Sequence, residues 1–390
     1  MKKFELVVEL NKEIMERKIN MDLLELKDWI GKTSNKAFDF INSTENKDIV
    51  LFGGGAALYW YLKFFNKYGV ISKIKYIVDN DSKKKGGKLY DIPVIGLSDI
   101  LYSSEEYRVV ITAPKYLGEI KEVLLKSFPE ENIFSFEAEI YYNFIHDISV
   151  YKKYLLDNWN RVIDLYMVLE DELSKKTLKA FVQGRISGEQ KYFIDVMVEN
   201  QYYPKDIIKF NENEVMVELG ANDGKTLLTF LNIVNRKYNK IYCFEPDKVC
   251  IEQLKELCSH EDGKIEIVEK GAWDAPAVLP FHSDAQFGAS HIVECDLTID
   301  ENILVDTIDN CVNTPVTYIK MDIEGAELRA LHGGKQTIQS CKPKLAICVY
   351  HNQEDLLDIV DYLKKLVPEY KFYLRHHNWG ATETVLYAIL

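Results

Sequence analysis

The chain has 390 residues, of which 47% are hydrophobic and 28% charged, with a formal net charge of −13. This length predicts two or three folded domains, and the acidic balance argues against a nucleic-acid partner, which normally requires clustered positive charge. Seven cysteines without a CxxC pair predict neither a disulfide framework nor a zinc site, which favours a reducing cytoplasm. The apolar runs are too short to span a membrane.

Residues 1–45 are predicted to form an N-terminal helical segment, and residues 46–139 a Rossmann-like α/β domain. Apolar strands at 48–52, 74–78, 93–95 and 109–112 alternate with helical stretches, as in parallel α/β units. Gly53-Gly54-Gly55 follows the first strand and Asp79 ends the second, as in a dinucleotide fingerprint, but Leu58 replaces the third glycine. The segment resembles the small Rossmann-like domains that precede sugar-modifying enzymes. This resemblance implies a nucleotide or nucleotide-sugar ligand, while a structural or dimerising role stays open.

Residues 140–210 contain few Gly or Pro and carry aromatic residues at helical spacing, which predicts a helical connector. A second α/β pattern occupies residues 211–390. Its strands are expected at 215–219, 240–244, 265–268, 318–321, 344–349, 372–375 and 384–389. Seven strands in this order are compatible with an open sheet that has a ligand crevice at its carboxyl edge.

The first strand of this second pattern ends at Glu218, and a glycine loop leads from it into a helix. Glycines allow close backbone approach to a ligand. Acidic residues in the loop would repel a pyrophosphate but not a cationic sulfonium with an amino-acid tail. The second strand ends at Glu245, which suits the two hydroxyls of a ribose, and Trp273 after the third strand could flank an adenine. The predicted cofactor residues are Glu218, Gly220, Asn222, Asp223, Gly224, Glu245, Pro246, Ala272 and Trp273.

Residues of about 200–390 resemble the FkbM family of methyltransferases. The resemblance is carried by the segments 217–224, 244–246, 343–351 and 373–388, and most distinctively by the Lys-x-Asp-x-Glu-Gly-Ala-Glu pattern at 320–327. It implies a class I methyltransferase fold and S-adenosylmethionine as the cofactor. Members of the family act mostly on hydroxyl groups of sugars and natural products, so we expect O-methylation of a sugar, nucleotide-sugar or glycan acceptor.

Methyl transfer to a hydroxyl requires orientation and a base. One residue separates Lys320 from Asp322, so their side chains should lie on the same side of a strand. We expect the catalytic residues to be Asp322, Lys320 and His351, with Asp322 at the methyl-transfer centre and either Asp322 or His351 as the base. Acceptor contacts are expected at Glu324, Glu327, Tyr203 and His376, and in a polar stretch at 281–296.

Several alternatives stay open at this point. Asp322, Glu324 and His351 have the donor types of a divalent-cation site, but no recognisable ligand spacing predicts one, so no metal is predicted. The chain could instead be a nucleotide-sugar dehydrogenase or epimerase that uses its N-terminal domain, or a non-catalytic scaffold. Its acceptor could also be a protein or a small metabolite, and the oligomeric state is not determined by the sequence.

Overall fold

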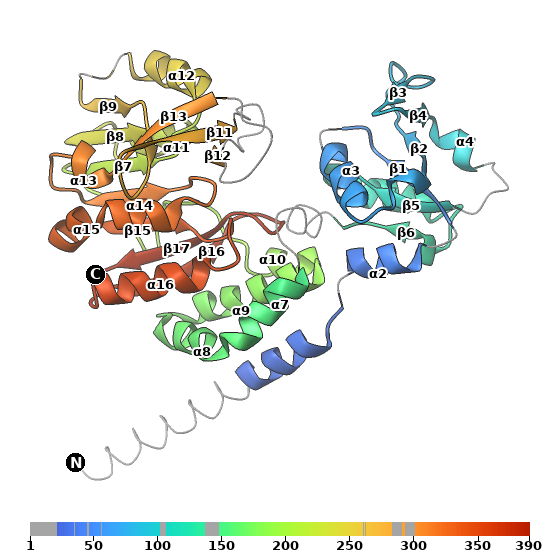
Figure 1. Cartoon of the computed structure of the whole chain (residues 1–390), viewed down its shortest axis with the longest axis horizontal. Coiled ribbons are helices and arrows are strands. Elements are labelled where there is room, and N and C mark those ends of the chain that lie inside the picture. Colours follow the sequence, from blue (N-terminus) through green and yellow to red (C-terminus); the bar gives the residue numbers. More distant parts are fainter. Residues whose placement is uncertain are drawn as a thin grey trace, which may run out of the picture. The chain divides into compact units, whose positions relative to one another are not determined.

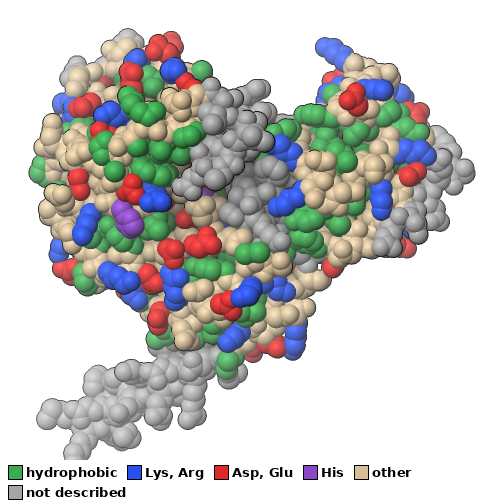
Figure 2. Space-filling model, viewed as in Figure 1, with side chains coloured by type: hydrophobic (Ala, Val, Ile, Leu, Met, Phe, Trp, Pro, Cys, Tyr) green, Lys and Arg blue, Asp and Glu red, His purple; other side chains and the backbone are tan. Residues whose placement is uncertain are grey.

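A computed structural model describes residues 22–34, 36–44, 47–55, 57–101, 107–136, 148–259, 261, 263–282, 291–292 and 301–390. The chain divides into two compact units, Met1–Asp157 with Ala180–Phe193, and Asn158–Lys179 with Ile194–Leu390 (Figure 1). Among the described residues, no helix is long and apolar enough to cross a membrane. On the face shown in Figure 2, acidic and basic side chains are interspersed over both units.

The first unit is built on a six-stranded sheet with the order β3-β4-β2-β1-β5-β6. Its elements are a helix over 22–32, α2 (Lys36–Ser43), β1 (Asp48–Phe52), α3 (Leu58–Lys67), β2 (Ile74–Val78), β3 (Lys88–Leu89), β4 (Ile92–Ile95), α4 (Leu97–Leu101), β5 (Tyr107–Ile111), α5 (Leu117–Leu124) and β6 (Ile133–Phe134). All neighbouring strands pair in parallel except β3 and β4. This confirms the predicted Rossmann-like α/β architecture of the N-terminal part.

Strand β1 lies in the middle of this sheet and is apolar because both of its faces are covered. Ile49 and Leu51 point into one hydrophobic core with Phe64 and Phe65 of α3. Val50 and Phe52 point into the core on the other face. The period of two along a strand therefore explains why the sequence shows a continuous apolar run here rather than an alternating one.

Four helices fall within the region predicted as a connector: α7 (Ile148–Asp157), α8 (Trp159–Val168), α9 (Glu172–Ser187) and α10 (Gln190–Ile194). The boundary between the two units passes through this helical region, since α7 belongs to the first unit and α8 to the second. Within the second unit, Arg161 of α8 forms ion pairs with Asp358 and Asp361 at 2.6 and 2.8 Å.

The second unit contains a seven-stranded sheet with the order β16-β17-β15-β14-β7-β8-β9. The strands are β7 (Val215–Leu219), β8 (Lys240–Phe244), β9 (Ile265–Val268), β14 (Tyr318–Met321), β15 (Lys344–Cys348), β16 (Lys371–His376) and β17 (Thr384–Ile389). Only β17 runs antiparallel to its neighbours within this sheet. The predicted seven-stranded α/β fold is confirmed, and every residue of β7 and β14 is buried.

Helices cover this sheet and connect its parallel strands: α11 (Lys225–Ile233), α12 (Lys248–Cys258), α13 (Ile308–Cys311), α14 (Glu327–Gly333), α15 (Lys335–Cys341) and α16 (Asp355–Leu366). Helices α14, α15 and α16 are neighbours on one face (Figure 1). Strands β7, β8 and β14 are adjacent and parallel, so the loops that follow them meet at one edge of the sheet.

A small sheet was not predicted from the sequence. It has the order β10-β13-β11-β12, formed by β10 (Gly271–Ala272), β11 (Ala277–His282), β12 (His291–Ile292) and β13 (Glu301–Asp306). Only one of its faces is buried, where Phe281 and Ile303 pack, whereas Val278 is 62% exposed. Part of the predicted acceptor stretch at 281–296 is therefore strand, and its residues 283–290 and 293–296 lie outside the described residues.

Candidate functional site

The first residue of the loop after β7, Gly220, must be a glycine. Gly220 has φ of +75°, and a Cβ placed on it would lie 1.9 Å from the backbone oxygen of Asp322, which follows β14. No L-residue fits such a contact without moving the backbone. Gly224, with φ of +78°, starts α11. The two glycines thus bring the loop against the end of β14 and leave its outer side open.

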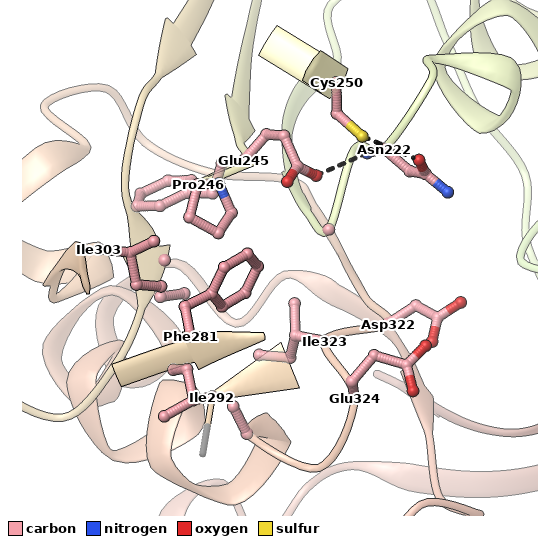
Figure 3. Close-up of a pocket in the computed structure, with 15 residues that line it drawn as sticks. Asn222, Glu245, Pro246, Cys250, Phe281, Ile292, Ile303, Asp322, Ile323 and Glu324 are labelled. Carbon is pink, nitrogen blue, oxygen red and sulfur yellow. Dashed lines mark hydrogen bonds between the residues drawn. The ribbon is translucent and has the colours of Figure 1, made fainter. Parts of the chain in front are cut away.

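The carboxylate of Glu245 fastens this loop to the end of β8. One oxygen accepts a hydrogen bond from the Asn222 backbone N–H at 2.8 Å, and the other accepts from the Asp247 N–H at 2.9 Å (Figure 3). Burial raises the pKa of Glu245, against the lowering effect of these two donors. A carboxylate has about four acceptor positions, so two remain for a ligand.

A pocket opens between these loops and the small sheet. It encloses about 740 Å³ of empty space, part of which is open to solvent. Its apolar wall contains Pro246, Phe281 and Ile303, and its other end contains the carboxylates of Asp322 and Glu324 (Figure 3). The pocket therefore offers a carboxylate for hydroxyl groups, an apolar slot and a separate acidic end. Gly220, Asn222, Gly271 and Ala272 line it as well.

Two charged residues lie behind the loop rather than in the pocket. Glu218 and Lys320 are partners in the register of β7 and β14, and both are buried. The ammonium of Lys320 donates to the carbonyl oxygen of Gly220 at 2.7 Å. Thr226 donates to one oxygen of Glu218, whose other oxygen has no hydrogen-bond partner among the described residues. Burial raises the pKa of Glu218, and the charge of Lys320 opposes that shift.

Asp322 is held from three sides at the acidic end of the pocket. The Tyr202 hydroxyl donates to its Oδ2 at 2.6 Å, and the Tyr350 hydroxyl lies 3.4 Å from Oδ1. The Nε2 atom of His351 is 3.5 Å from the same Oδ1. Burial alone would raise the pKa of Asp322, but Lys320, His351 and the Tyr202 hydrogen bond together lower it. This carboxylate is therefore ionised near neutral pH.

His351 lies directly behind Asp322 and is only 7% exposed. Its Nδ1 is 2.9 Å from Glu327 Oε1, and its Nε2 is 3.4 Å from Glu324 Oε2. Burial lowers the pKa of the imidazole, but the surrounding carboxylates outweigh this and raise it well above 6.5. The ring is thus positively charged near neutral pH, a state in which it cannot accept a proton.

Two further carboxyl groups border Asp322. Burial raises the pKa of Glu324 to about 7, and Glu324 has an unusual φ of +52° beside Gly325. Burial and the charge of Asp322 raise the pKa of Glu383 to about 7, and the Gln201 side-chain amide donates to this carboxyl. One ligand atom each from Asp322, Glu324 and His351 lie within 4.8 Å of one another, a spacing that a divalent cation would also require.

The other residues predicted for the site lie away from the pocket. Asp223 pairs with Lys225 at 2.5 Å, beside the loop. Trp273 packs against the small sheet, where the ring of Phe281 occupies the pocket wall instead. Tyr203 is buried among aromatic rings and donates to the Thr226 carbonyl oxygen at 2.9 Å. The buried His376 contacts Thr384 at 2.8 Å.

Sequence reasoning missed several residues that contact the site, namely Tyr202, Tyr350, Glu383 and Ile303, and it assigned Phe281 to an acceptor stretch rather than to the apolar pocket wall. Tyr202 precedes the sheet in sequence, and nothing local to it indicates a contact 120 residues away. The strands that carry Phe281 and Ile303 gave no alternating signal, because their outward positions include the apolar residues Val278 and Leu304, which are 62% and 55% exposed.

Part of the chain is similar to a known protein family. Residues 218–372 match the model of the methyltransferase FkbM domain. The chain carries an FkbM methyltransferase domain. The match spans the glycine loop, Glu245, Asp322 and His351. It supports methyl transfer and does not favour the dehydrogenase or epimerase alternative. A comparison with curated proteins finds no match.

One solved structure shows the same fold over nearly the whole chain. A crystal structure of an FkbM methyltransferase from Methylobacillus flagellatus KT aligns with a TM-score of 0.76 and 22% identity, over 95% of this chain and 99% of that one. The likeness therefore extends beyond the FkbM domain to the N-terminal unit. An rRNA methylase from Streptococcus thermophilus aligns with a TM-score of 0.31 and 14% identity, over 46% of this chain and 86% of that one. A methyltransferase-like protein from Streptococcus mutans, in complex with SAH, aligns with a TM-score of 0.30 and 13% identity, over 46% of this chain and 91% of that one.

Proposed function

We propose that the chain is an S-adenosylmethionine-dependent methyltransferase that methylates a hydroxyl group of a sugar or glycan. The observation that supports this best is one pocket lined by the glycine loop, Glu245 and Asp322 together. The three come from the ends of three adjacent parallel strands, β7, β8 and β14.

The donor set fits S-adenosylmethionine in each of its parts. The free acceptor positions of Glu245 suit a ribose diol, because a carboxylate accepts two hydroxyl donors. Pro246, Phe281 and Ile303 offer an apolar slot for a flat purine ring. The ionised Asp322 provides negative charge that would attract a cationic ligand and repel a pyrophosphate.

In this proposal Asp322, and not His351, is the base. S-adenosylmethionine supplies a methyl group on a positively charged sulfur. Asp322 would take the proton of the acceptor hydroxyl as its oxygen bonds to the methyl carbon, and the sulfur of the bound cofactor would be the leaving group. The Tyr202 hydroxyl keeps the carboxylate oriented, and the charge of His351 keeps it ionised. Lys320 acts as a positioning residue through the Gly220 carbonyl.

The polar groups beside Asp322 support a hydroxyl-rich acceptor. Glu324, Glu383 and Gln201 offer carboxyl and amide groups around the same carboxylate. Such groups pair well with vicinal hydroxyls, since they accept and donate at fixed positions. The resemblance to FkbM methyltransferases supports the same class of acceptor, and we place the reaction in the cytoplasm on the basis of the cysteine pattern.

The test is a screen with methyl-labelled S-adenosylmethionine against nucleotide sugars and glycan fragments, read by mass spectrometry. We expect label on an oxygen atom of one acceptor class. Label on protein or on a non-sugar metabolite would contradict the acceptor but leave methyl transfer intact. An absence of S-adenosylmethionine binding by calorimetry would contradict the whole proposal.

A further inference from the structure

A second cavity lies in the N-terminal unit, far in sequence from the residues of the methyl-transfer site. It encloses about 1110 Å³, including space open to solvent, at the carboxyl ends of β1, β2 and β5. The chain passes from β1 through α3 to β2 on one side of the sheet, whereas β5 pairs with the other side of β1. In open α/β sheets, such a reversal of strand order leaves a crevice where ligands bind.

The three glycines that border this cavity are not equivalent. A Cβ on Gly53 would lie 2.7 Å from the Ala113 Cβ, and one on Gly54 would lie 2.8 Å from Asp79 Oδ2. The fold itself therefore requires Gly53, which has a φ of +123°, whereas a side chain at Gly54 would displace the Asp79 carboxylate. Gly55 has no positive φ, and no atom lies within 4 Å of a Cβ built on it. The fold does not need a glycine there, but a ligand that approaches the backbone closely would.

The polar side of the cavity pairs a carboxylate with an ammonium. Asp79 accepts from the Gly54 N–H at 2.9 Å and from the Asp81 N–H at 2.8 Å. Lys84 contacts Asp79 at 3.0 Å and the Gly54 carbonyl at 3.1 Å. Burial opposes ionisation of Asp79, but these donors lower its pKa overall. The remaining charged residue in the lining, Glu119, is exposed and solvated.

The opposite side of the cavity is apolar. Leu97, Ile120 and Val123 line it, and the ring of Tyr116 is 51% exposed at its rim. An aromatic ring beside an apolar strip suits a nucleobase, which stacks on such surfaces. The acid at the end of the second strand suits ribose hydroxyls, and the ammonium beside the glycine loop suits a phosphate.

We propose that this cavity binds a single nucleotide unit, a nucleoside diphosphate or its sugar ester. A dinucleotide is disfavoured by Leu58, which begins α3 where a third glycine would allow the helix to pack closely on the strand. Leu58 is 1% exposed and part of the core. The proposal stands on the N-terminal unit alone and does not depend on methyl transfer.

The test is calorimetric titration of the full chain with uridine, adenosine and guanosine diphosphates and with NAD. We expect one diphosphate to bind more tightly than NAD. Gly55→Ala should weaken binding of that diphosphate at least 10-fold while the unfolding midpoint stays within about 2 °C, because the added Cβ has no protein atom within 4 Å. Lys84→Met should also weaken binding of the same diphosphate. The matched control is Lys83→Met, the same change at an exposed residue outside the cavity lining, and it should leave affinity unchanged.

Three results would overturn the proposal. The first is no binding of any diphosphate at about 1 mM. The second is tighter binding of NAD than of every diphosphate. The third is diphosphate binding that survives both Gly55→Ala and Lys84→Met, which would locate the nucleotide elsewhere in the chain.

Discussion

Replacing Glu245 with glutamine tests the cofactor pocket through a change of a single atom. In the native site, one carboxylate oxygen accepts from the Asn222 N–H and the other from the Asp247 N–H. Whichever way a glutamine amide turns, its NH₂ group faces one of these donors. The substitution therefore loses one backbone hydrogen bond and removes the charge that should bind the ribose hydroxyls.

The expected loss follows from these contacts. Hydrogen bonds to a charged group contribute about 1.5–3 kcal/mol each, so loss of one to the ribose should raise the dissociation constant about 10- to 100-fold. The assay is calorimetric titration with S-adenosylmethionine and, separately, with S-adenosylhomocysteine. Because the two share the ribose, both should weaken equally. Glu256→Gln, on the exposed side of α12, is the matched control and should bind both normally.

Two results would refute this reasoning. Unchanged affinity of the Glu245→Gln variant for both ligands would remove Glu245 from the ribose site. Weaker binding of S-adenosylmethionine alone would show that Glu245 acts on the sulfonium charge instead, because S-adenosylhomocysteine lacks that charge.

Two other predictions concern stability. Burial raises the pKa of Glu324 from 4.5 to about 7. Between these pH values the folded chain therefore holds a proton that the unfolded chain has lost. The resulting contribution to the free energy of unfolding is fully present below about pH 4.5 and is lost as the pH rises to 7. Glu324→Gln should therefore flatten the fall of the unfolding midpoint between those pH values, and an unchanged slope would contradict the shift. Gly220→Ala should destabilise by about 2–5 kcal/mol, from its left-handed φ and its contact with the Asp322 oxygen. Gly263→Ala, with a φ of +69° and no neighbouring atom, isolates the contact; equal losses in the two variants, measured by chemical denaturation, would show that the contact contributes nothing.

The sequence was sufficient for the large sheet because its central strands β7, β8 and β14 are buried on both faces. Strands β7, β8, β9 and β14 are each followed directly by a glycine or an acid, and their predicted bounds match the structure. The small sheet was missed for the opposite reason. Its strands are half exposed, and Pro280 within β11 weakens the strand signal.

The chemistry of the acidic end could be predicted only in part. The spacing of Lys320 and Asp322 predicted only that they share one side of a strand. In the structure both contact Tyr202, which was not predicted: Lys320 Nζ lies 5.1 Å from its ring, and Asp322 accepts from its hydroxyl. The charge state of His351 could not be read from the sequence. It depends on Glu327 and Glu324, which approach the ring only after β15 and the start of α14 have packed together.

The central claim is that Asp322 accepts the proton during methyl transfer at a pocket that holds S-adenosylmethionine. The most direct test is single-turnover transfer of labelled methyl, with saturating cofactor, in the native chain and in Asp322→Asn. Asparagine can still accept from the Tyr202 hydroxyl, so the fold and the cofactor affinity should change by no more than a few fold. We predict that the transfer rate falls about 10²- to 10⁴-fold at unchanged cofactor affinity. Transfer at the native rate in this variant would contradict the claim.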